Sequence, residues 1–139
     1  MANDKEKITR IYGQRGIFRE GAWKTDSDKL FGRAEAVATW RLLKQFGLVP
    51  SPNSDLVFVS PSSNVPTHET AIWQEESQTR SGKSIFLAGD LLPINPKQAL
   101  DENEVVSTPN NQFTYFRWDA ERLPLVKASA DVIWDRKGW

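Results

Sequence analysis

The sequence predicts an α/β protein built on an open parallel sheet in three layers, and two features of the chain predict it. Short apolar runs at residues 56–59 and 84–88 are typical of strands that are buried in a parallel sheet. Longer segments with helical periodicity or helix-capping residues lie between such runs. Because strands that alternate with helices normally lie parallel, we expect one sheet with helices on its faces.

The composition is that of one ordinary globular domain. The chain has 139 residues, 39% hydrophobic and 26% charged, which is enough for a single core. Its 18 basic residues balance 18 acidic ones, so binding to nucleic acid is not expected. The absence of cysteine excludes disulfides, a thiolate metal site and a cysteine nucleophile. With no secretory signal and no apolar run of about 20 residues, we expect a cytoplasmic protein without a membrane partner.

The first elements in chain order are an arm and a helix. Residues 1–30 are expected to form an N-terminal arm, because glycines interrupt their scattered apolar residues. A helix is predicted over residues 33–46, where apolar residues recur at every third position. Gly47 and Pro50 directly afterwards are typical helix stops.

The later elements follow from apolar runs and capping residues. Thr67 is a good helix cap, so a helix is predicted over residues 68–80, and its few apolar residues indicate a largely exposed helix at the edge of the fold. A short helix is expected over residues 97–104. Strands are predicted at residues 56–59, 84–88, 113–117 and 130–134. The predicted core consists of Val37, Trp40, Leu43, Phe46, Leu56, Phe58, Ile85, Leu87, Phe113, Tyr115, Val132 and Ile133.

Two aspartates lie where open α/β sheets bind ligands, just past the carboxyl ends of strands. Asp90 ends the second strand, where a carboxylate can accept hydrogen bonds from both hydroxyls of a ribose. The alternative is that Gly89-Asp90 is simply a turn. Asp119 and Ala120 follow the third strand, where a carboxylate beside an exposed backbone N–H can bind adenine. The alternative there is a capping aspartate.

Three other features of the sequence are candidate sites. His68, the only histidine, is expected in the first turn of the helix after the first strand, and a lone histidine predicts no metal site. Asp135 follows the last strand, but no base or nucleophile is identified beside it, so no catalytic residue is assigned. The GKS triplet at residues 82–84 is rejected as a phosphate-binding loop, because Ser77 stands where the motif needs its first glycine and the triplet precedes a strand.

Two segments of the chain resemble the class I S-adenosylmethionine-dependent methyltransferases. The segment WDAERLPL (residues 118–125) is similar to the family's third-strand region, and SADVI (residues 129–133) is similar to the start of its fourth strand. Asp90 falls where the family places its ribose-binding acid. The resemblance implies a Rossmann-like sheet of strand order 3-2-1-4 with S-adenosylmethionine as the cofactor. It also implies that Asp90 binds the ribose and that Asp119 and Ala120 bind the adenine.

The chain departs from the family pattern at three points. The loop after the first strand, residues 60–64, contains no glycine, whereas the family has a glycine-rich loop there that lets the backbone approach the cofactor. The interval from Ser60 to Asp90 is longer than usual. The sequence ends at Trp139, just after the fourth strand, where the family's sheet continues. Residues 31–139 are therefore expected to form a partial domain, truncated after its fourth strand.

Two functions remain open from the sequence. The resemblance implies a methyltransferase-like domain, in truncated or degenerate form, with an unknown methyl acceptor. The alternative is a non-catalytic interaction or assembly module on the same scaffold, which the missing glycines favour. Because an exposed last strand at Ile133 and Trp134 is prone to pair with another chain, a homo-oligomer or a partner chain is expected at that edge.

Overall fold

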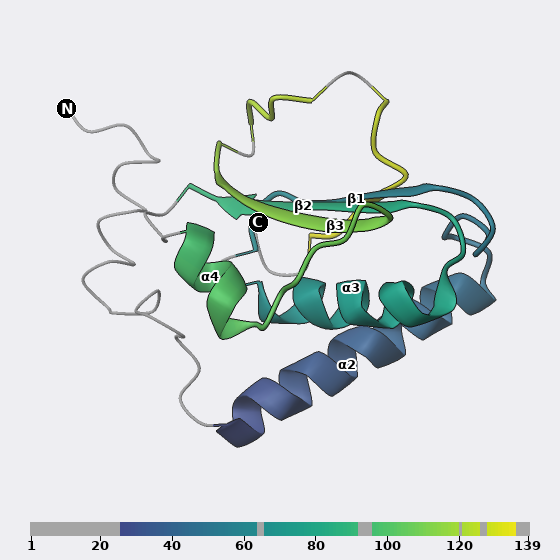
Figure 1. Cartoon of the computed structure of the whole chain (residues 1–139), viewed down its shortest axis with the longest axis horizontal. Coiled ribbons are helices and arrows are strands. Elements are labelled where there is room, and N and C mark those ends of the chain that lie inside the picture. Colours follow the sequence, from purple (N-terminus) through teal and green to yellow (C-terminus); the bar gives the residue numbers. More distant parts are fainter. Residues whose placement is uncertain (1–25, 64–65, 92–95, 120, 126–127, 136–139) are drawn as a thin grey trace.

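The structure, a computed structural model, describes residues 26–63, 66–91, 96–119, 121–125 and 128–135. Its helices and strands alternate as the sequence predicts (Figure 1). In chain order they are α2 (Asp26–Gln45), β1 (Leu56–Ser60), α3 (Thr67–Thr79), β2 (Ser84–Asp90), α4 (Pro96–Glu102), β3 (Asn111–Arg117) and β4 (Val132–Ile133). Helix α2 begins earlier than predicted, and residues 1–25 of the expected N-terminal arm lie outside the described residues.

The four strands form one parallel sheet in the order β3-β2-β1-β4, which confirms the predicted α/β class and the predicted strand order. The register sets Phe58 of β1 opposite both Phe86 of β2 and Val132 of β4. Phe86 in turn lies opposite Phe113 of β3. Strand β1 therefore lies inside the sheet, with β2 on one side of it and β4 on the other.

One face of the sheet carries the core, because its large side chains point toward the helices. Phe58 stacks on Phe86 with ring centroids 4.5 Å apart, and Phe86 stacks on Phe113 at 6.1 Å. Trp40 of α2 meets Phe58 edge to face at 5.6 Å. Each of these four side chains is at most 3% exposed. A continuous aromatic layer thus joins three strands to α2, and its burial is a main source of stability.

All the described helices lie on the same side of the sheet (Figure 1). Helix α3 packs against β2 and β3, and α2 packs along α3. The described parts of the connection between β3 and β4 lie on the other side of the sheet. A helical layer on that second face, which three layers would require, is not found among the described residues. The described fold is therefore an α/β sheet covered by helices on one face.

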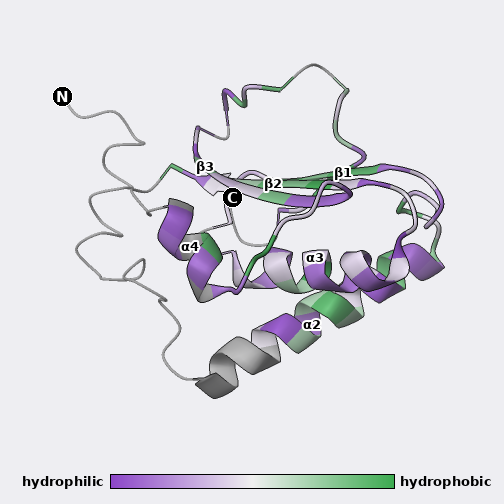
Figure 2. Ribbon diagram, viewed as in Figure 1, coloured by the Kyte–Doolittle hydropathy of each residue, from purple (hydrophilic) through white to green (hydrophobic). Residues whose placement is uncertain are grey.

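The second face of the sheet leaves apolar side chains in solvent, and this corrects the predicted core. Ile85 is 39% exposed and Ile133 is 66% exposed, although both were expected to be buried. Alternate residues of a strand point to opposite faces, so Phe86 rather than Ile85 reaches the core. Phe46 was also expected in the core and is 70% exposed just past the end of α2. Figure 2 shows hydrophobic residues along β1 and β2, whereas α2 carries both hydrophobic and hydrophilic residues.

Helix α3 lies between α2 and the sheet, so the expected exposed edge helix is wrong. Seven of its residues are buried, and most of the polar ones among them have described hydrogen-bond partners. The buried residues are Thr67, Glu69, Thr70, Ala71, Ile72, Trp73 and Glu76. Their burial follows from partners supplied by neighbouring elements, which hydropathy along one segment does not reveal.

A buried carboxylate joins α2 to α3. Glu76 is 1% exposed, and its Oε1 atom accepts a hydrogen bond from Trp40 Nε1 at 2.6 Å. The same oxygen forms an ion pair with Lys44 Nζ at 2.5 Å. Its Oε2 atom accepts a hydrogen bond from Arg80 Nε at 2.7 Å. Both carboxylate oxygens are thus occupied by donors, as a buried charge requires.

The guanidinium of Arg80 extends this network to the connection between α2 and β1. Arg80 Nη1 donates to the carbonyl oxygens of Ser51 at 2.6 Å and Ser54 at 2.9 Å. Arg80 Nη2 donates to the carbonyl oxygen of Pro50 at 2.9 Å. The last turn of α3 therefore fixes the backbone that leads into the first strand.

The two edges of the sheet differ. On the β3 edge, Ser107 Oγ accepts a hydrogen bond from the N–H of Phe113 at 3.0 Å, and the N–H of Thr108 donates to the carbonyl oxygen of Asn111 at 3.0 Å. On the other edge, β4 is only two residues long, although the N–H groups of Asp131 and Trp134 also donate to β1 at 2.9 and 2.8 Å. A strand this short offers little backbone for pairing with another chain.

Candidate functional site

The candidate site is the edge of the sheet where the strands end. Ser60 ends β1, Asp90 ends β2 and Arg117 ends β3. Because β2 and β4 lie on opposite sides of β1, the strand order reverses at the end of β1. In open α/β sheets, ligands bind outside the carboxyl ends of the strands at such a reversal.

Four buried polar residues gather at this edge, on the side that α3 covers. Ser60, Glu69, Asp90 and Tyr115 are between 1% and 9% exposed. Ser60 Oγ donates to Glu69 Oε1 at 3.0 Å, which ties the end of β1 to the first turn of α3. Tyr115 was expected only in the core, and Glu69 was not a candidate site residue, so the sequence analysis missed this cluster.

The electrostatics of the cluster favour a neutral phenol among negative charges. Burial raises the pKa of Tyr115 above its ordinary range, and the negative charge of Asp90 and, more weakly, that of Glu69 raise it further. A hydrogen bond with the Ser63 side chain acts in the opposite direction without offsetting them. Tyr115 therefore keeps its proton at neutral pH and can serve as a hydrogen-bond donor.

Asp90 lies at the end of β2, as the sequence predicts. Its carbonyl oxygen accepts a hydrogen bond from the N–H of Trp118 at 3.0 Å, and the residue is 9% exposed. A ribose on this carboxylate would have to reach a largely buried group. The role of Asp90 in binding a ribose stays a prediction.

Asp119 follows β3 at the same edge, and its side chain shapes a turn. Asp119 Oδ1 accepts a hydrogen bond from the N–H of Glu121 at 2.9 Å, and its carbonyl oxygen accepts one from Arg122 at 2.9 Å. This is the capping geometry that was the alternative to adenine binding. Ala120 lies outside the described residues, so adenine binding by Asp119 and Ala120 stays a prediction.

The loop after β1 is attached to β2 and β3. The N–H of Ser63 donates to the carbonyl oxygen of Gly89 at 2.9 Å, and Trp118 Nε1 donates to that of Pro61 at 3.0 Å. Trp118 also stacks on Phe116 with centroids 5.3 Å apart. A Cβ atom on Gly89 would lie 2.5 Å from Trp118 Nε1, so only glycine fits there. The hydrogen bonds and the ring stack hold the loop where the methyltransferase family has its glycines.

The remaining candidate residues are His68, Asp135 and the GKS triplet. His68 is half-buried in the first turn of α3, and Asp135 is exposed directly after Trp134 at the end of the last strand. The GKS triplet lies at the opposite end of β2, where a Cβ atom on Gly82 would lie 2.1 Å from the carbonyl oxygen of Ser54. A position this crowded by backbone cannot cradle a phosphate, in agreement with the rejection of that motif.

Chemically, the edge offers hydrogen-bonding groups to a ligand. In the described part of the chain, no three histidine, aspartate or glutamate side chains are grouped so that they could hold a metal ion. The cluster offers two carboxylates as acceptors and one neutral phenol as a donor, a set that matches ligand hydroxyl or amino groups.

Comparisons with known proteins identify no relative. No family model, no curated protein and no solved structure matches the chain. The helices of the described residues include none that is both long enough and apolar enough to cross a membrane.

Proposed function

We propose that this chain is a methyltransferase-like domain that binds S-adenosylmethionine at the carboxyl edge of its sheet. The observation that carries the proposal is the parallel strand order β3-β2-β1-β4, with Asp90 as the last residue of β2 and Asp119 two residues past the end of β3. This arrangement sets acidic acceptors beside the point where the strand order reverses, which is where such sheets bind nucleotides.

The residues have distinct roles in this proposal. The carboxylate of Asp90 accepts hydrogen bonds from the ribose hydroxyls, and the turn at Asp119 and Ala120 faces the adenine. Bound S-adenosylmethionine supplies a methyl group on a positively charged sulfur. The two carboxylates beside Tyr115 add negative charge to the same edge, which favours a cation. The contribution of the chain is the positioning of donor and acceptor, which is the main requirement of a direct methyl transfer.

Calorimetric titration with S-adenosylhomocysteine tests the proposal. The wild-type chain is expected to release or absorb heat on binding, and Asp90→Asn is expected to bind about tenfold more weakly or worse. The reason is that hydrogen bonds to a charged group contribute about 1.5–3 kcal/mol.

The matched control for this titration is Asp55→Asn, directly before β1 at the amino ends of the strands. Asp55 is exposed and its Oδ1 atom accepts a hydrogen bond from the N–H of Lys83 at 2.9 Å, an acceptor role that asparagine retains. The control should bind like the wild type. No heat from the wild-type chain at millimolar ligand would contradict the proposal.

A second candidate function is a non-catalytic assembly module, and the face of the sheet that carries no described helix favours it. Ile85, Phe116 and Ile133 are 39%, 38% and 66% exposed on that face. Parallel sheets are normally covered on both faces, so these side chains are candidates for contact with another chain.

Sedimentation velocity distinguishes this candidate from a monomeric binding domain. An assembly module should sediment as a dimer or larger species at tens of micromolar, and Ile133→Ser should shift it to the monomer because a polar side chain weakens an apolar contact. Val106→Ser is the control, since Val106 is 76% exposed and lies outside the sheet. A wild-type chain that stays monomeric would count against assembly.

A further inference from the structure

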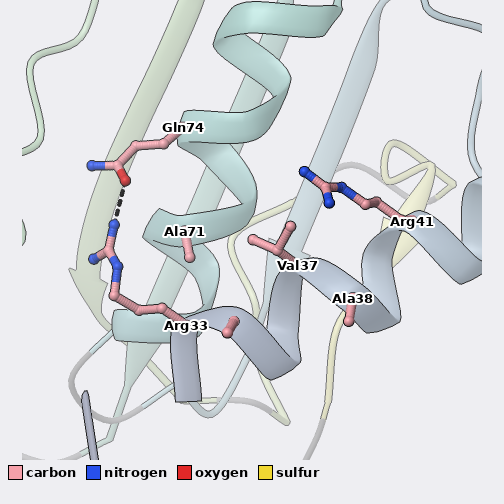
Figure 3. Close-up of a pocket in the computed structure, with 7 residues that line it drawn as sticks. Arg33, Val37, Ala38, Arg41, Ala71 and Gln74 are labelled. Atoms are coloured by element: carbon pink, nitrogen blue, oxygen red, sulfur yellow. Dashed lines mark hydrogen bonds between the residues drawn. The ribbon is translucent and has the colours of Figure 1, made fainter. Parts of the chain in front are cut away.

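A groove between two helices has the features of a docking site. Its volume is about 380 Å³. Figure 3 shows the lining residues of α2 and α3, with Arg33 and Gln74 joined across the space between the two helices. The residues that line the α2–α3 groove are Arg33, Ala34, Val37, Ala38, Arg41, Ala71 and Gln74.

The groove continues into an exposed apolar row along α2. Ala34, Ala38, Leu42 and Phe46 are spaced four residues apart and all are exposed. Leu42 is 50% exposed and Phe46 is 70% exposed. The N–H of Phe46 donates to the carbonyl oxygen of Leu42 at 3.1 Å, so the helical geometry extends to Phe46. Residues four apart form a ridge on a helix, and ridges of this kind pack into the grooves of a second helix.

The sizes of these side chains also suit a helix. The two alanines of the row leave the backbone of α2 open to close approach, and Ala71 of α3 extends the small-residue floor (Figure 3). The two large side chains, Leu42 and Phe46, then supply anchors at the end of the row. Amphipathic helices bind such grooves through anchors at helical spacing.

A charge at one end of the groove lacks a carboxylate partner in the described residues. Arg33 Nη2 donates to Gln74 Oε1, a neutral amide (Figure 3). Burial lowers the pKa of Arg33, and the nearby charge of Glu104 acts in the opposite direction without offsetting the burial. Arg41, two turns along α2, instead forms an ion pair with Glu75 at 2.8 Å. The groove thus presents one half-buried cation that an incoming carboxylate would neutralise.

We propose that the α2–α3 groove and the row of Ala34, Ala38, Leu42 and Phe46 dock an acidic amphipathic helix of a partner protein. A second copy of this chain fits less well, because pairing two α2 helices would set arginines against arginines. The partner helix carries small or apolar residues toward α2 and a carboxylate toward Arg33. This docking is a separate proposal from cofactor binding at the sheet edge.

A displayed library of random 16-residue peptides tests the chemistry of the partner. Peptides are selected for binding to the purified wild-type chain. Those that also bind the double variant Arg33→Gln/Phe46→Ser are then removed. The surviving peptides are expected to be acidic, with apolar residues at helical spacing. Enrichment of basic or uncharged peptides, or no enrichment at all, would overturn the proposal.

The affinity of the best enriched peptide for single variants of the chain then shows whether it binds the α2–α3 groove. Fluorescence anisotropy is expected to show about tenfold weaker binding for Phe46→Ser and for Arg33→Gln, because a lost anchor or charge contact costs about 1–2 kcal/mol. Val106→Ser, which is exposed and lies outside the sheet and outside both helices of the groove, should bind as the wild type does. Thermal unfolding of each variant verifies that it is folded.

Two results would contradict the docking proposal at this stage. One is equal binding by Phe46→Ser and the wild type. The other is self-association of the wild-type chain that Phe46→Ser abolishes, which would make a second copy the occupant of the groove.

Discussion

Replacement of Glu76 by alanine is expected to lower the free energy of unfolding by about 3–5 kcal/mol. The carboxylate of Glu76 accepts a hydrogen bond from Trp40 Nε1 and forms ion pairs with Lys44 Nζ and Arg80 Nε. The side chains of Glu76 and Arg80 are at most 1% exposed. Its removal leaves the Arg80 cation buried without its carboxylate partner, and that unpaired charge is the main cost. Urea unfolding followed by circular dichroism measures the loss.

The neighbouring residue supplies a matched control. Glu75 pairs with Arg41 at 2.8 Å, but the Arg41 side chain is 68% exposed. Solvent screens this pair, so Glu75→Ala should cost about 0–1 kcal/mol. Similar losses for the two variants would show that the Glu76 network does not hold α2 on α3.

The same network predicts the response of stability to acid. Burial alone would raise the pKa of Glu76, but hydrogen bonds from Lys44, Trp40 and Arg80 outweigh it and hold the pKa below the ordinary value of 4.5. A carboxyl whose pKa is lower in the folded state stabilises the fold fully above its ordinary pKa. This stabilisation is lost as the pH falls through the lower, folded-state pKa. The wild type should therefore lose more stability than Glu76→Ala between about pH 5 and pH 3.

Replacement of Phe58 by alanine is the second change with a large expected effect, a loss of about 3–5 kcal/mol. Phe58 is fully buried and touches aromatic rings on every side: Phe86 at 4.5 Å, Trp40 at 5.6 Å and Trp134 at 6.1 Å. Because these three rings come from β2, from α2 and from the residue after β4, the surroundings cannot collapse into the cavity without shifting the sheet or α2.

Phe46→Ala is the control for this second change. The residue type is the same, but Phe46 is 70% exposed, so the loss should be within about 0.5 kcal/mol. Chemical unfolding of both variants under identical conditions gives the comparison. A loss below about 1.5 kcal/mol for Phe58→Ala would contradict a core centred on β1.

The positions of the strands could be predicted from the sequence, whereas the faces of the sheet could not. Apolar runs between turns located β1 and β2 closely, and the resemblance implied the strand order that the structure shows. A continuous apolar run does not show which of its alternate residues faces the helices. Ile85 was therefore placed in the core that Phe86 occupies.

The helices show a second limit of sequence patterns. Trp40 and Phe46 both fit the three-residue spacing of the predicted helix, but only Trp40 points to the sheet. Glu76 and Arg80, four residues apart, have the spacing of an exposed helix face, yet they form the buried ion pair of α3. Their partners come from α2 and from the loop before β1, which no local pattern identifies.

The candidate site was predictable in position and less so in composition. Asp90 and Asp119 were expected at strand ends because polar turns follow apolar runs, and the structure places both at the same edge. The association of Glu69 with Ser60 and of Tyr115 with Asp90 depends on side chains from separate elements. Only the folded chain brings them together.

The hydrogen bonds of Arg80 affect which parts of the protein unfold together. The three carbonyl oxygens that it binds lie 26 to 30 positions earlier in the chain, in a segment without regular structure of its own. If the last turn of α3 unwinds, that segment loses its donors, and if the segment moves, Arg80 loses its acceptors. The two stretches therefore form one cooperative unit in local unfolding, and the approach to β1 is released only when the end of α3 is released as well.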